Sequence, residues 1–389
     1  MRVFQSLLLF IPVIVAEFVP GGSFGRPTIG PYNNCSGELT SRPKDLAIDT
    51  LPNISPDAPS GWERWDLTMY QDGLFLSMRW IQGDPASSHS VPADGTFELV
   101  AKFANGTSYA THTSGHKLTS TNDTSLYSIT IADNTLSWDD TQTSFNTTLS
   151  LNGLTATFSS ESIMLDKFSP YAGWIIGQLT ENLFSGIPMT RGRTHVGSIK
   201  FPWGQEVTLK ADSVLTHMFS EEPLPTLATS YAIRVFRSSG KDFGDTFIYE
   251  SSRAPNTSEY NAFFLGRAEN RGPSFEPYTF YAGTNNELLS THQANSTSIS
   301  AQLAGCAHTN NVPFSWNFTL PSKPTAEHID SAGGKTSYFI ASVHAAEPNG
   351  NVVEQQSGMG FVQVYESAGA GLTQNIPSLG GEQPDPDAQ

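Results

Sequence analysis

Apolar and polar side chains alternate with a period of two through much of this sequence, which restricts the folds that the chain can adopt. Many segments show it, each bounded by Gly, Asn, Asp or Pro: "TFELVAKF", "SLYSITIA", "TSFNTTLSL", "ATFSSESI", "QEVTLKA", "YAIRVFRSS", "DTFIYESS", "SYFIASVHA" and "GFVQVYES". Such alternation is typical of half-buried strands in antiparallel sheets. Helical periodicity is confined to residues 171–184 and 284–295, which are too short to organise a helical domain. The sequence therefore predicts an all-β fold.

The length of the chain, 389 residues, exceeds what one hydrophobic core usually serves. The clearest linker is "SEEPLPTLATS", residues 220–230, which holds two prolines between strand-like segments. We expect an N-terminal β-sandwich-like domain over residues 17–219 and a C-terminal lipocalin-like β-barrel over residues 231–379. The interface of two such domains is a preferred place for a ligand cleft. Residues 380–389, rich in Gly, Pro and acids, are expected to be a disordered tail.

The N-terminal segment, "MRVFQSLLLFIPVIVAEF", has the composition of a secretory signal peptide cut after Ala16. Its apolar run is too short to span a membrane. We therefore expect residues 1–16 to be removed and the mature chain to enter the secretory pathway or leave the cell.

Asparagine sequons agree with this route, because N-x-S/T is the acceptor of N-linked glycans. The expected glycosylation sites are Asn34, Asn105, Asn122, Asn146, Asn256, Asn295 and Asn317. The sequon of Asn53 is left out because Pro56 follows it directly. The chain has two cysteines, Cys35 and Cys306, and an oxidising compartment favours a disulfide between them, with a free pair as the alternative.

The surface is expected to be polar and mildly acidic. The net charge is −16 and charged residues make up 15% of the chain, against about 25% in an average soluble domain. Nucleic acid and anionic membrane surfaces both require basic patches, so neither is expected as a partner. After the signal peptide, no segment reaches 18 uninterrupted apolar residues, so the mature chain is expected to be soluble. The sequence does not distinguish a monomer from a homodimer.

The standard catalytic signatures are missing from the sequence. It contains no H-E-x-x-H, C-x-x-C, G-x-S-x-G or P-loop, and no G-x-G-x-x-G that opens a helix after a strand. His112 and His116 stand four apart in a Gly/Ser/Thr-rich segment, where zinc would require helical spacing or a third ligand. We therefore expect neither a metal nor a cofactor.

One stretch, residues 61–80, "GWERWDLTMYQDGLFLSMRW", concentrates aromatic and charged residues in two short segments around Asp72 and Gly73. In strand geometry, alternate residues share a face. One face of the first segment carries Trp62, Arg64, Asp66, Thr68 and Tyr70, and the other carries Glu63, Trp65, Leu67 and Met69. The first of these faces mixes aromatic and polar groups, as the walls of small-molecule pockets do.

Two side chains are candidates for acid–base chemistry. Asp66 stands between Trp65 and Leu67, where apolar surroundings would raise its pKa and make it a proton donor. The alternative is an ion pair of Asp66 with Arg64 or Arg79. His217 precedes the linker, where it would face the cleft or instead bond a strand carbonyl. Trp80 and Trp316 are predicted as further aromatic walls of the pocket. For each tryptophan of the chain, packing in a core is the alternative.

Three blocks, "GWERWDLTMYQDGLFLSMRW", "HMFSEEPLPTLATSYAIRVFRSSG" and "GMGFVQVYESAG", together resemble the fungal lipocalin-like Diels-Alderases in order, spacing and total length. With its signal peptide and sequons, the chain is most similar to the secreted hetero-Diels-Alderases of tropolone sesquiterpenoid pathways. The resemblance implies a β-sandwich, a lipocalin-like barrel, a substrate between them and no cofactor. It also implies that Trp65, Phe219, Tyr231, Phe361 and Gln363 line the pocket.

The implied reaction is an intermolecular hetero-Diels-Alder cycloaddition of a tropolone o-quinone methide, formed by dehydration, with a humulene-type sesquiterpene. Such a reaction needs the two partners held in one geometry in a dry cavity. Asp66 and His217 are the candidates for the acid that assists dehydration. Where the family often has a second linker tryptophan, this chain has Leu224. The competing hypotheses are a secreted lipocalin-like carrier of an apolar metabolite and a carbohydrate-active protein, which would need paired carboxylates.

Overall fold

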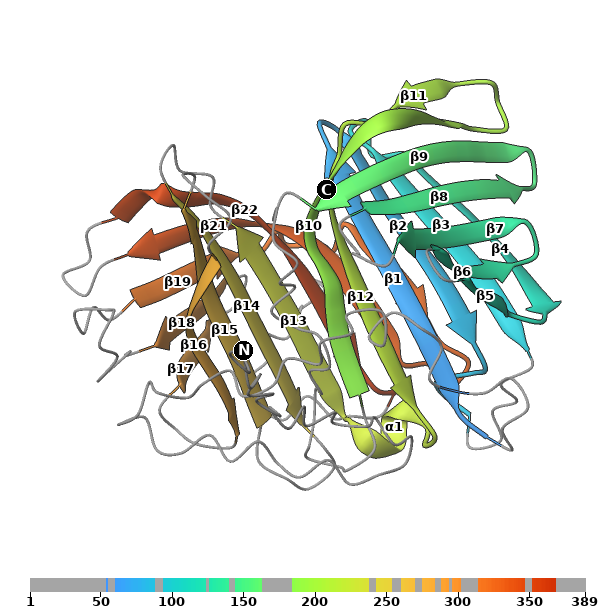
Figure 1. Ribbon diagram of the computed structural model, residues 1–389. Coiled ribbons are helices and arrows are strands. Elements are labelled where there is room, and N and C mark those ends of the chain that lie inside the picture. The colour runs from blue at the N-terminus through green and yellow to red at the C-terminus, as the bar shows by residue number, and fades with distance from the viewer. Residues whose placement is uncertain are drawn as a thin grey trace, which may run out of the picture.

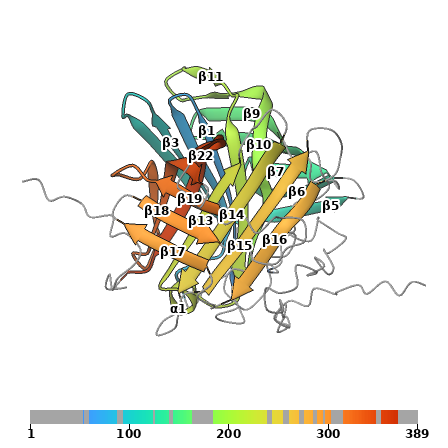
Figure 2. The same ribbon diagram turned by 90° about the vertical axis from the view of Figure 1, so that its left-hand side faces the viewer.

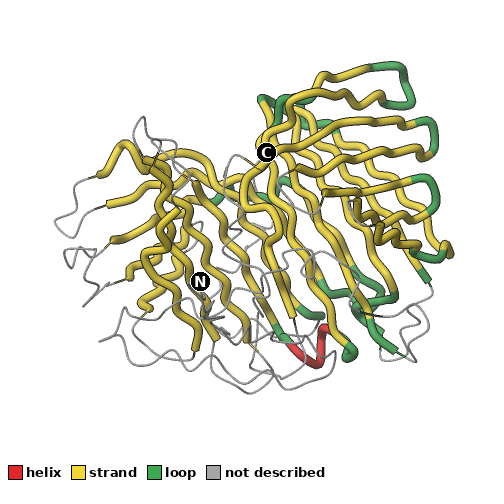
Figure 3. The backbone as a smooth tube through the Cα atoms, in the orientation of Figure 1, coloured by secondary structure: helices red, strands yellow, loops and turns green. Residues whose placement is uncertain are grey.

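The structure is a computed structural model. It describes residues 54, 60–87, 94–123, 126–139, 144–162, 184–237, 243–253, 260–269, 275–283, 288–293, 296–301, 314–346 and 352–368. These residues form two antiparallel sheets, which lie beside each other in Figure 1, the first blue to green and the second olive to red. Strands dominate the tube drawing (Figure 3), and the described residues contain one short helix, Leu224–Leu227.

The first sheet has 12 strands in the order β4-β3-β2-β1-β12-β10-β9-β8-β7-β6-β5, with β11 paired to β10. Their bounds are β1 Trp62–Gln71, β2 Leu74–Gln82, β3 Gly95–Phe103, β4 Ser108–His116, β5 Thr119–Asp123, β6 Leu126–Ile131, β7 Asn134–Asp139, β8 Ser144–Leu151, β9 Leu154–Ser162, β10 Phe184–Lys200, β11 Glu206–Thr208 and β12 Asp212–Ser220. Most neighbours in this order follow each other in the chain, so the sheet is built from successive hairpins.

A four-residue helix, α1 (Leu224–Leu227), follows β12 and leads to the second sheet. That sheet has 10 strands in the order β16-β15-β14-β13-β22-β21-β19-β18-β17, with β20 paired to β21. Their bounds are β13 Ser230–Arg237, β14 Phe243–Arg253, β15 Tyr260–Glu269, β16 Phe275–Gly283, β17 Leu288–Gln293, β18 Ser296–Ala301, β19 Phe314–Thr319, β20 Ala326–Ile329, β21 Lys335–Ala346 and β22 Val352–Glu366.

The prediction of a mostly β protein is confirmed, and each of the alternating segments quoted above contains a strand. The expected closure of the second half into a barrel is not found among the described residues, because the end strands β16 and β17 are not paired there. The helical interpretation of residues 284–295 is wrong, since Leu288–Gln293 form β17 and pair with β18. Pairing between strands overrides weak local periodicity in so short a segment. Of residues 171–184, Phe184 alone is described, as the first residue of β10.

The main core of the first sheet lies on one face of β1, β2 and β3. Trp65, Leu67 and Met69 of β1 belong to it, and their partners Trp80 and Met78 of β2 project to the same side. A second core joins the two sheets through Trp62, Met218, Leu224, Tyr231 and Tyr365 with five other residues. The period-two alternation of β1 therefore sends its odd-numbered side chains into one sheet's own core and its even-numbered ones toward the other sheet.

Candidate functional site

Charged side chains line up across β1, β2 and β3 on the face that meets the second sheet. Asp66 of β1 pairs in register with Arg79 of β2, and Arg79 pairs with Glu98 of β3. Directly opposite residues of opposite charge stabilise neighbouring strands. Because these residues alternate with core residues, the sequence that fills the core on one face also places this row on the other.

Asp66 is buried and is surrounded by hydrogen-bond donors. Its Oδ2 lies 3.0 Å from Arg64 Nε, and its Oδ1 lies 3.3 Å from Arg79 Nε. Two side chains of the second sheet also donate to Oδ2, Tyr338 over 3.3 Å and Gln363 over 3.1 Å. Of the two sequence-based interpretations of Asp66, the structure therefore shows the ion pairs, and it shows them with both arginines.

Arg64 links this carboxylate to Tyr231 of β13. Its Nη2 donates to the Tyr231 hydroxyl over 2.6 Å, and Gln363 Nε2 donates to the same hydroxyl over 3.1 Å. Burial opposes the charge of the guanidinium, but Asp66 and the tyrosines outweigh it and raise the pKa of Arg64 above its ordinary value. Tyr338 stays neutral, because burial and the charge of Asp66 raise its pKa.

Glu98 connects Arg79 to His328 of β20. Its Oε2 lies 3.1 Å from Arg79 Nη1 and 3.0 Å from His328 Nδ1. Burial raises the pKa of Glu98, but Arg79 and His328 outweigh it and lower the pKa to about 2. Burial and Arg79 lower the pKa of His328, so its ring is neutral at pH 7. A neutral ring that donates from Nδ1 to Glu98 accepts at Nε2, where Ser77 Oγ lies 3.2 Å away.

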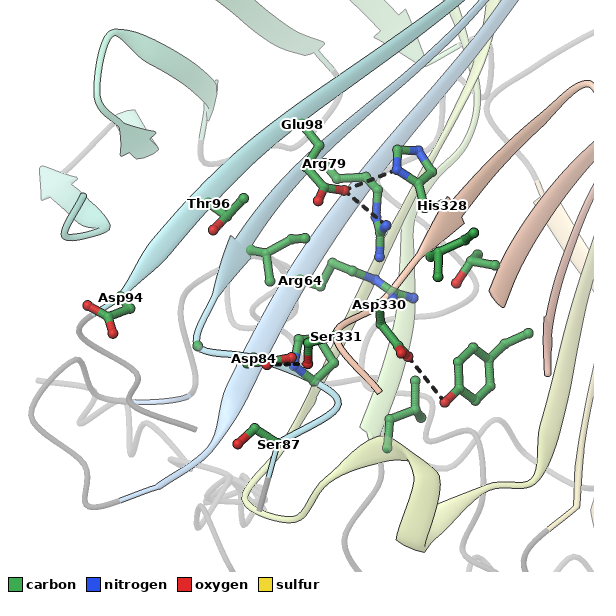
Figure 4. A pocket seen from close by; sticks show the side chains of 17 residues that line it. Arg64, Arg79, Asp84, Ser87, Asp94, Thr96, Glu98, His328, Asp330 and Ser331 are labelled. Atoms are coloured by element: carbon green, nitrogen blue, oxygen red, sulfur yellow. Dashed lines mark hydrogen bonds and ion pairs between the residues drawn. The ribbon is translucent and has the colours of Figure 1, made fainter. Parts of the chain in front are cut away.

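A cavity of about 420 Å³ lies above this row of charges, between the two sheets. Figure 4 shows the guanidinium groups of Arg64 and Arg79 inside it, with Glu98 and His328 on one side and Asp330 on the other. The volume is in the range of small-molecule sites, about 300–1,000 Å³. Among the described residues, neither Arg64 Nη1 nor Arg79 Nη2 makes a hydrogen bond or an ion pair. The cavity therefore offers N–H donors of two fixed cations to a ligand.

The outer wall of the cavity is formed by the turn between β20 and β21. Asp330 shapes this turn, since its Oδ1 accepts from the backbone N–H of Ala332 over 3.0 Å and of Gly334 over 2.6 Å. Ser331 Oγ then donates over 2.6 Å to Asp84 Oδ2, in the loop after β2. The wall thus joins the two sheets through side chains that are 247 positions apart in sequence.

The linker closes another side of the cavity. The backbone N–H of Leu224 donates over 2.7 Å to the carbonyl of Pro85, which fixes the start of α1 against the loop after β2. Leu224 lines the cavity, and Trp62 Nε1 donates over 2.7 Å to the carbonyl of Glu222. Leu224, which stands where the resembling family often has a tryptophan, therefore contributes directly to the shape of the cavity.

The structure places four predicted site residues on the opposite face of the first sheet: Trp65, Trp80, His217 and Phe219. There His217 stacks on Trp65 with ring centroids 4.7 Å apart, and its Nε2 lies 2.7 Å from Glu63 Oε1. Trp80 Nε1 donates to the carbonyl of Asn134 within the core. The imidazole of His217 thus bonds a carboxylate, and neither His217 nor Asp66 is among the residues that line the cavity.

The other predicted pocket residues lie in or near the second sheet. Tyr231 and Gln363 join the hydrogen bonds around Asp66. Phe361 and Gln363 line a separate space of about 20 Å³ between the sheets, which has room for about one water. Trp316 lies in β19, paired with Ile299 of β18, and its side chain is outside the described ones.

The predicted disulfide and several predicted glycosylation sites fall outside the described residues: Cys35, Cys306, Asn34, Asn256 and Asn295. Asn53 falls outside them as well. Asn105 and Asn146 are exposed, in the β3–β4 turn and in β8. Asn122 and Asn317 lie in β5 and β19.

Sequence reasoning missed five polar residues of the site. Arg64, Arg79 and Glu98 were not predicted as cavity residues, and His328 and Tyr338 were not considered. The available signal was the charge pattern, because Arg64, Asp66 and Arg79 all fall on the face that does not build the core. His328 carried no such signal, since it reaches Glu98 from a strand that is far away in sequence.

Within the part of the chain that the structure describes, no group of three or more His, Cys, Asp or Glu is arranged to hold a metal ion. His112 and His116 are exposed on β4. In the same residues, no helix combines the length and the hydrophobicity needed to cross a membrane.

Comparisons with known proteins concern the fold. No protein-family model matches the chain, and no curated protein matches it. Among solved structures, the chain is similar to CghA, a fungal Diels-Alderase crystallised with Sch210972. The two share 12% identity and a TM-score of 0.53 over 80% of this chain and 89% of CghA. An AttH-like protein from Nitrosomonas europaea matches at 13% identity, with a TM-score of 0.47 over 79% of this chain and 93% of that one. This chain therefore has a fold like that of CghA.

Proposed function

We propose that this chain is a cofactor-free pericyclase that binds its substrates in the cavity between the two sheets and catalyses a cycloaddition. The observation that carries the proposal is the floor of the cavity, which Arg64 and Arg79 line while Asp66 and Glu98 hold them in ion pairs. The fold likeness to a Diels-Alderase supports the reaction class by analogy.

The chemistry of a cycloaddition matches such a site. The reaction requires no nucleophile, but it requires both partners held together in one orientation, which can supply much of the rate enhancement. Fixed hydrogen-bond donors that point at an oxygen of one partner withdraw electron density and stabilise the charge that develops there. Arg64 and Arg79 are such donors, and they do not have to reorient. Asp66 forms ion pairs with both and accepts a hydrogen bond from Arg79 Nε, and Tyr231 accepts one from Arg64 Nη2.

For the substrates, we propose a tropolone o-quinone methide and a humulene-type sesquiterpene. The methide forms when a hydroxymethyl tropolone loses water: the carbon–oxygen bond of the hydroxymethyl group breaks and the ring hydroxyl gives up its proton. The cycloaddition then joins the methide carbon and the ring oxygen to the two alkene carbons, with no change in overall oxidation state. A tropolone is a vinylogous acid, so its oxygens suit the two guanidinium groups.

In this proposal Asp66 is a positioning residue, because it touches the arginines and not the cavity. We also propose that the chain divides at residues 220–230 into a β-sandwich and a lipocalin-like barrel. The proposal further includes a cleaved signal peptide, secretion, N-linked glycans and a disulfide between Cys35 and Cys306.

The proposal is tested by incubating the full chain with a hydroxymethyl tropolone and a hydroxylated humulene, and by following the adduct and its isomers by chiral chromatography. We expect a rate and a stereochemical excess above the protein-free reaction. Arg79→Lys keeps the charge but loses the planar fork, so it should reduce the rate at least tenfold. Lys200→Gln, an exposed site on β10, is the matched control and should react like the parent chain.

A chain that binds either compound tightly but leaves the rate and the isomer ratio unchanged would be a carrier, and the proposed reaction would be wrong. Absence of both binding and acceleration would also overturn the proposal and would favour the carbohydrate-active alternative. If Arg79→Lys leaves the acceleration intact, the reaction does not depend on the guanidinium group of Arg79, and the proposed role of the arginines is wrong.

A further inference from the structure

At one end of the first sheet, the β3–β4 and β10–β11 turns bring four aromatic residues together: Phe103, Tyr109, Phe201 and Trp203. Both turns lie at the same end of the sheet in Figure 2. The cluster is not part of the cavity between the sheets. Its outermost member, Trp203, is 53% exposed, which is a large exposure for a tryptophan that already has three aromatic neighbours.

One face of the Trp203 indole is covered and the other is open. Phe201 stacks on the indole with ring centroids 4.8 Å apart and planes 14° apart, while Tyr109 and Phe103 meet it edge-on. The indole N–H donates over 3.0 Å to Gln205 Oε1, so its polar atom is satisfied. What remains accessible is an apolar aromatic face. Such a face commonly packs against the C–H groups of a sugar, which carry partial positive charge.

The sequon Asn105-Gly106-Thr107 lies between two members of this cluster in sequence. It forms the turn that connects Phe103 to Tyr109, and the turn is closed by hydrogen bonds from Phe103 N to the Thr107 carbonyl and from Gly106 N to the Phe103 carbonyl, both 2.9 Å. Gly106 has a φ of 82°, a left-handed conformation that favours glycine at this position. The turn therefore holds the sequon within two residues of two members of the aromatic cluster.

The side chain of Asn105 is oriented by its own sequon. Its Oδ1 accepts from the Thr107 backbone N–H over 3.0 Å and from Thr107 Oγ1 over 2.7 Å. Thr107 pairs with Phe103, and directly opposite residues of a hairpin project to the same face of the sheet. The Asn105 side chain is therefore turned toward the face that carries the aromatic cluster. Its Nδ2 has no recorded partner among the described residues, and the residue is exposed.

We propose that Asn105 carries an N-linked glycan whose first N-acetylglucosamine packs on the open face of Trp203. In the modification, Asn105 Nδ2 forms a bond to the anomeric carbon of a lipid-linked oligosaccharide. The bond from that carbon to the donor's pyrophosphate breaks, and Nδ2 loses a proton. The sugar then covers the apolar surface that the cluster exposes, so the glycan at this turn stabilises the fold. This proposal is independent of the cycloaddition and rests on passage of the chain through the secretory pathway.

The test uses the full chain secreted from a eukaryotic host, with its glycans trimmed to a single N-acetylglucosamine. Peptide mass spectrometry should find Asn105 occupied. Asn105→Gln should lower the Tm by about 2–4 °C, the shift expected for loss of one such contact in a domain of this size. In a Trp203→Ala background the same substitution should lower the Tm by much less, because the contact is already gone.

Asn146 provides the matched control. Its sequon is exposed on β8, where Ser137 and Ser159 are its paired neighbours in place of aromatic rings. Asn146→Gln should therefore shift the Tm equally in the parent and Trp203→Ala backgrounds. As a second readout, hydroxyl-radical oxidation of Trp203 should rise several-fold when Asn105 is replaced. An unoccupied Asn105, or a Tm loss at Asn105 that does not depend on Trp203, would overturn the proposal.

Discussion

Tyr338 of the second sheet donates a hydrogen bond of 3.3 Å to Asp66 of the first, across 272 positions of sequence. The same carboxylate holds both arginines of the cavity floor. Asp66 therefore contributes both to the contact between the sheets and to the geometry of the site.

Asp66→Asn is expected to destabilise the chain severely. It removes the charge that compensates Arg64 and Arg79, and breaking a buried ion pair on one side costs about 3–5 kcal/mol. Tyr338→Phe removes one neutral donor and should cost about 1 kcal/mol. Urea unfolding followed by tryptophan fluorescence measures both. Asp72→Asn, in the exposed β1–β2 turn, is the control and should stay within about 0.5 kcal/mol of the parent. Equal effects of Asp66→Asn and Tyr338→Phe would contradict the central role of Asp66.

Stability should decline on acidification because of His328. Burial and Arg79 lower its pKa from the ordinary 6.5, so below pH 6.5 the unfolded chain binds more protons than the folded one. The stability from this group is complete above pH 6.5 and is lost as the pH falls toward the lowered pKa. Glu98, with its pKa lowered from 4.5 to about 2, adds a second decline between those values.

Unfolding free energies measured from about pH 8 to about pH 2 check this expectation. His328→Gln should flatten the decline that begins near pH 6.5. The more acidic decline should become smaller but persist, because Arg79 still lowers the pKa of Glu98. His112→Gln, at an exposed site on β4, should leave the whole profile unchanged. If the pH profile of His328→Gln is parallel to that of the parent chain, His328 does not contribute to the pH dependence of the unfolding free energy.

Trp65→Ala is expected to lose stability and activity together. The tryptophan is fully buried in the core of the first sheet and stacks on His217, and removing so large a buried side chain costs about 3–5 kcal/mol. Trp65→Phe should cost considerably less. Thermal unfolding and product formation are measured on the same samples. A stable Trp65→Ala chain with greatly reduced turnover would instead place Trp65 against the substrate.

Ile329 should influence substrate binding without supporting the fold. It lines the cavity, yet it is 73% exposed. Ile329→Glu should raise KM several-fold and change the unfolding free energy by less than about 0.5 kcal/mol. Leu126→Glu, at another exposed apolar residue on β6, is the control and should leave KM unchanged. Steady-state kinetics at several substrate concentrations compare the two variants. Equal KM values would show that Ile329 does not influence substrate binding.

Much of the fold could be predicted because strand alternation is a local signal. The segment from Thr96 to Phe103 shows why: its apolar residues Phe97, Leu99 and Ala101 fall on one face, and all three are buried. The segment around Leu288 shows the limit of such reasoning. The segment is too short for its periodicity to distinguish a helix from a strand. It forms a strand because it pairs with β18.

The site could be predicted in part. Residues 61–80 contribute strands to the site, but Trp65 and Trp80, which are predicted as pocket walls, lie on the face that builds the core. Alternation separates two faces of a strand without showing which one meets another sheet. The partners His328 and Tyr338 come from the second sheet, and nothing local in the sequence connects them to Asp66.

The cavity belongs to both sheets, since its floor comes from one and its outer wall from the other, with Leu224 of the linker between them. A molecule held there loses part of its binding surface if either half unfolds. By linkage, every ligand of this cavity stabilises both halves at once. Occupancy would therefore raise the cooperativity of unfolding, so that two halves able to unfold separately would unfold in a single transition.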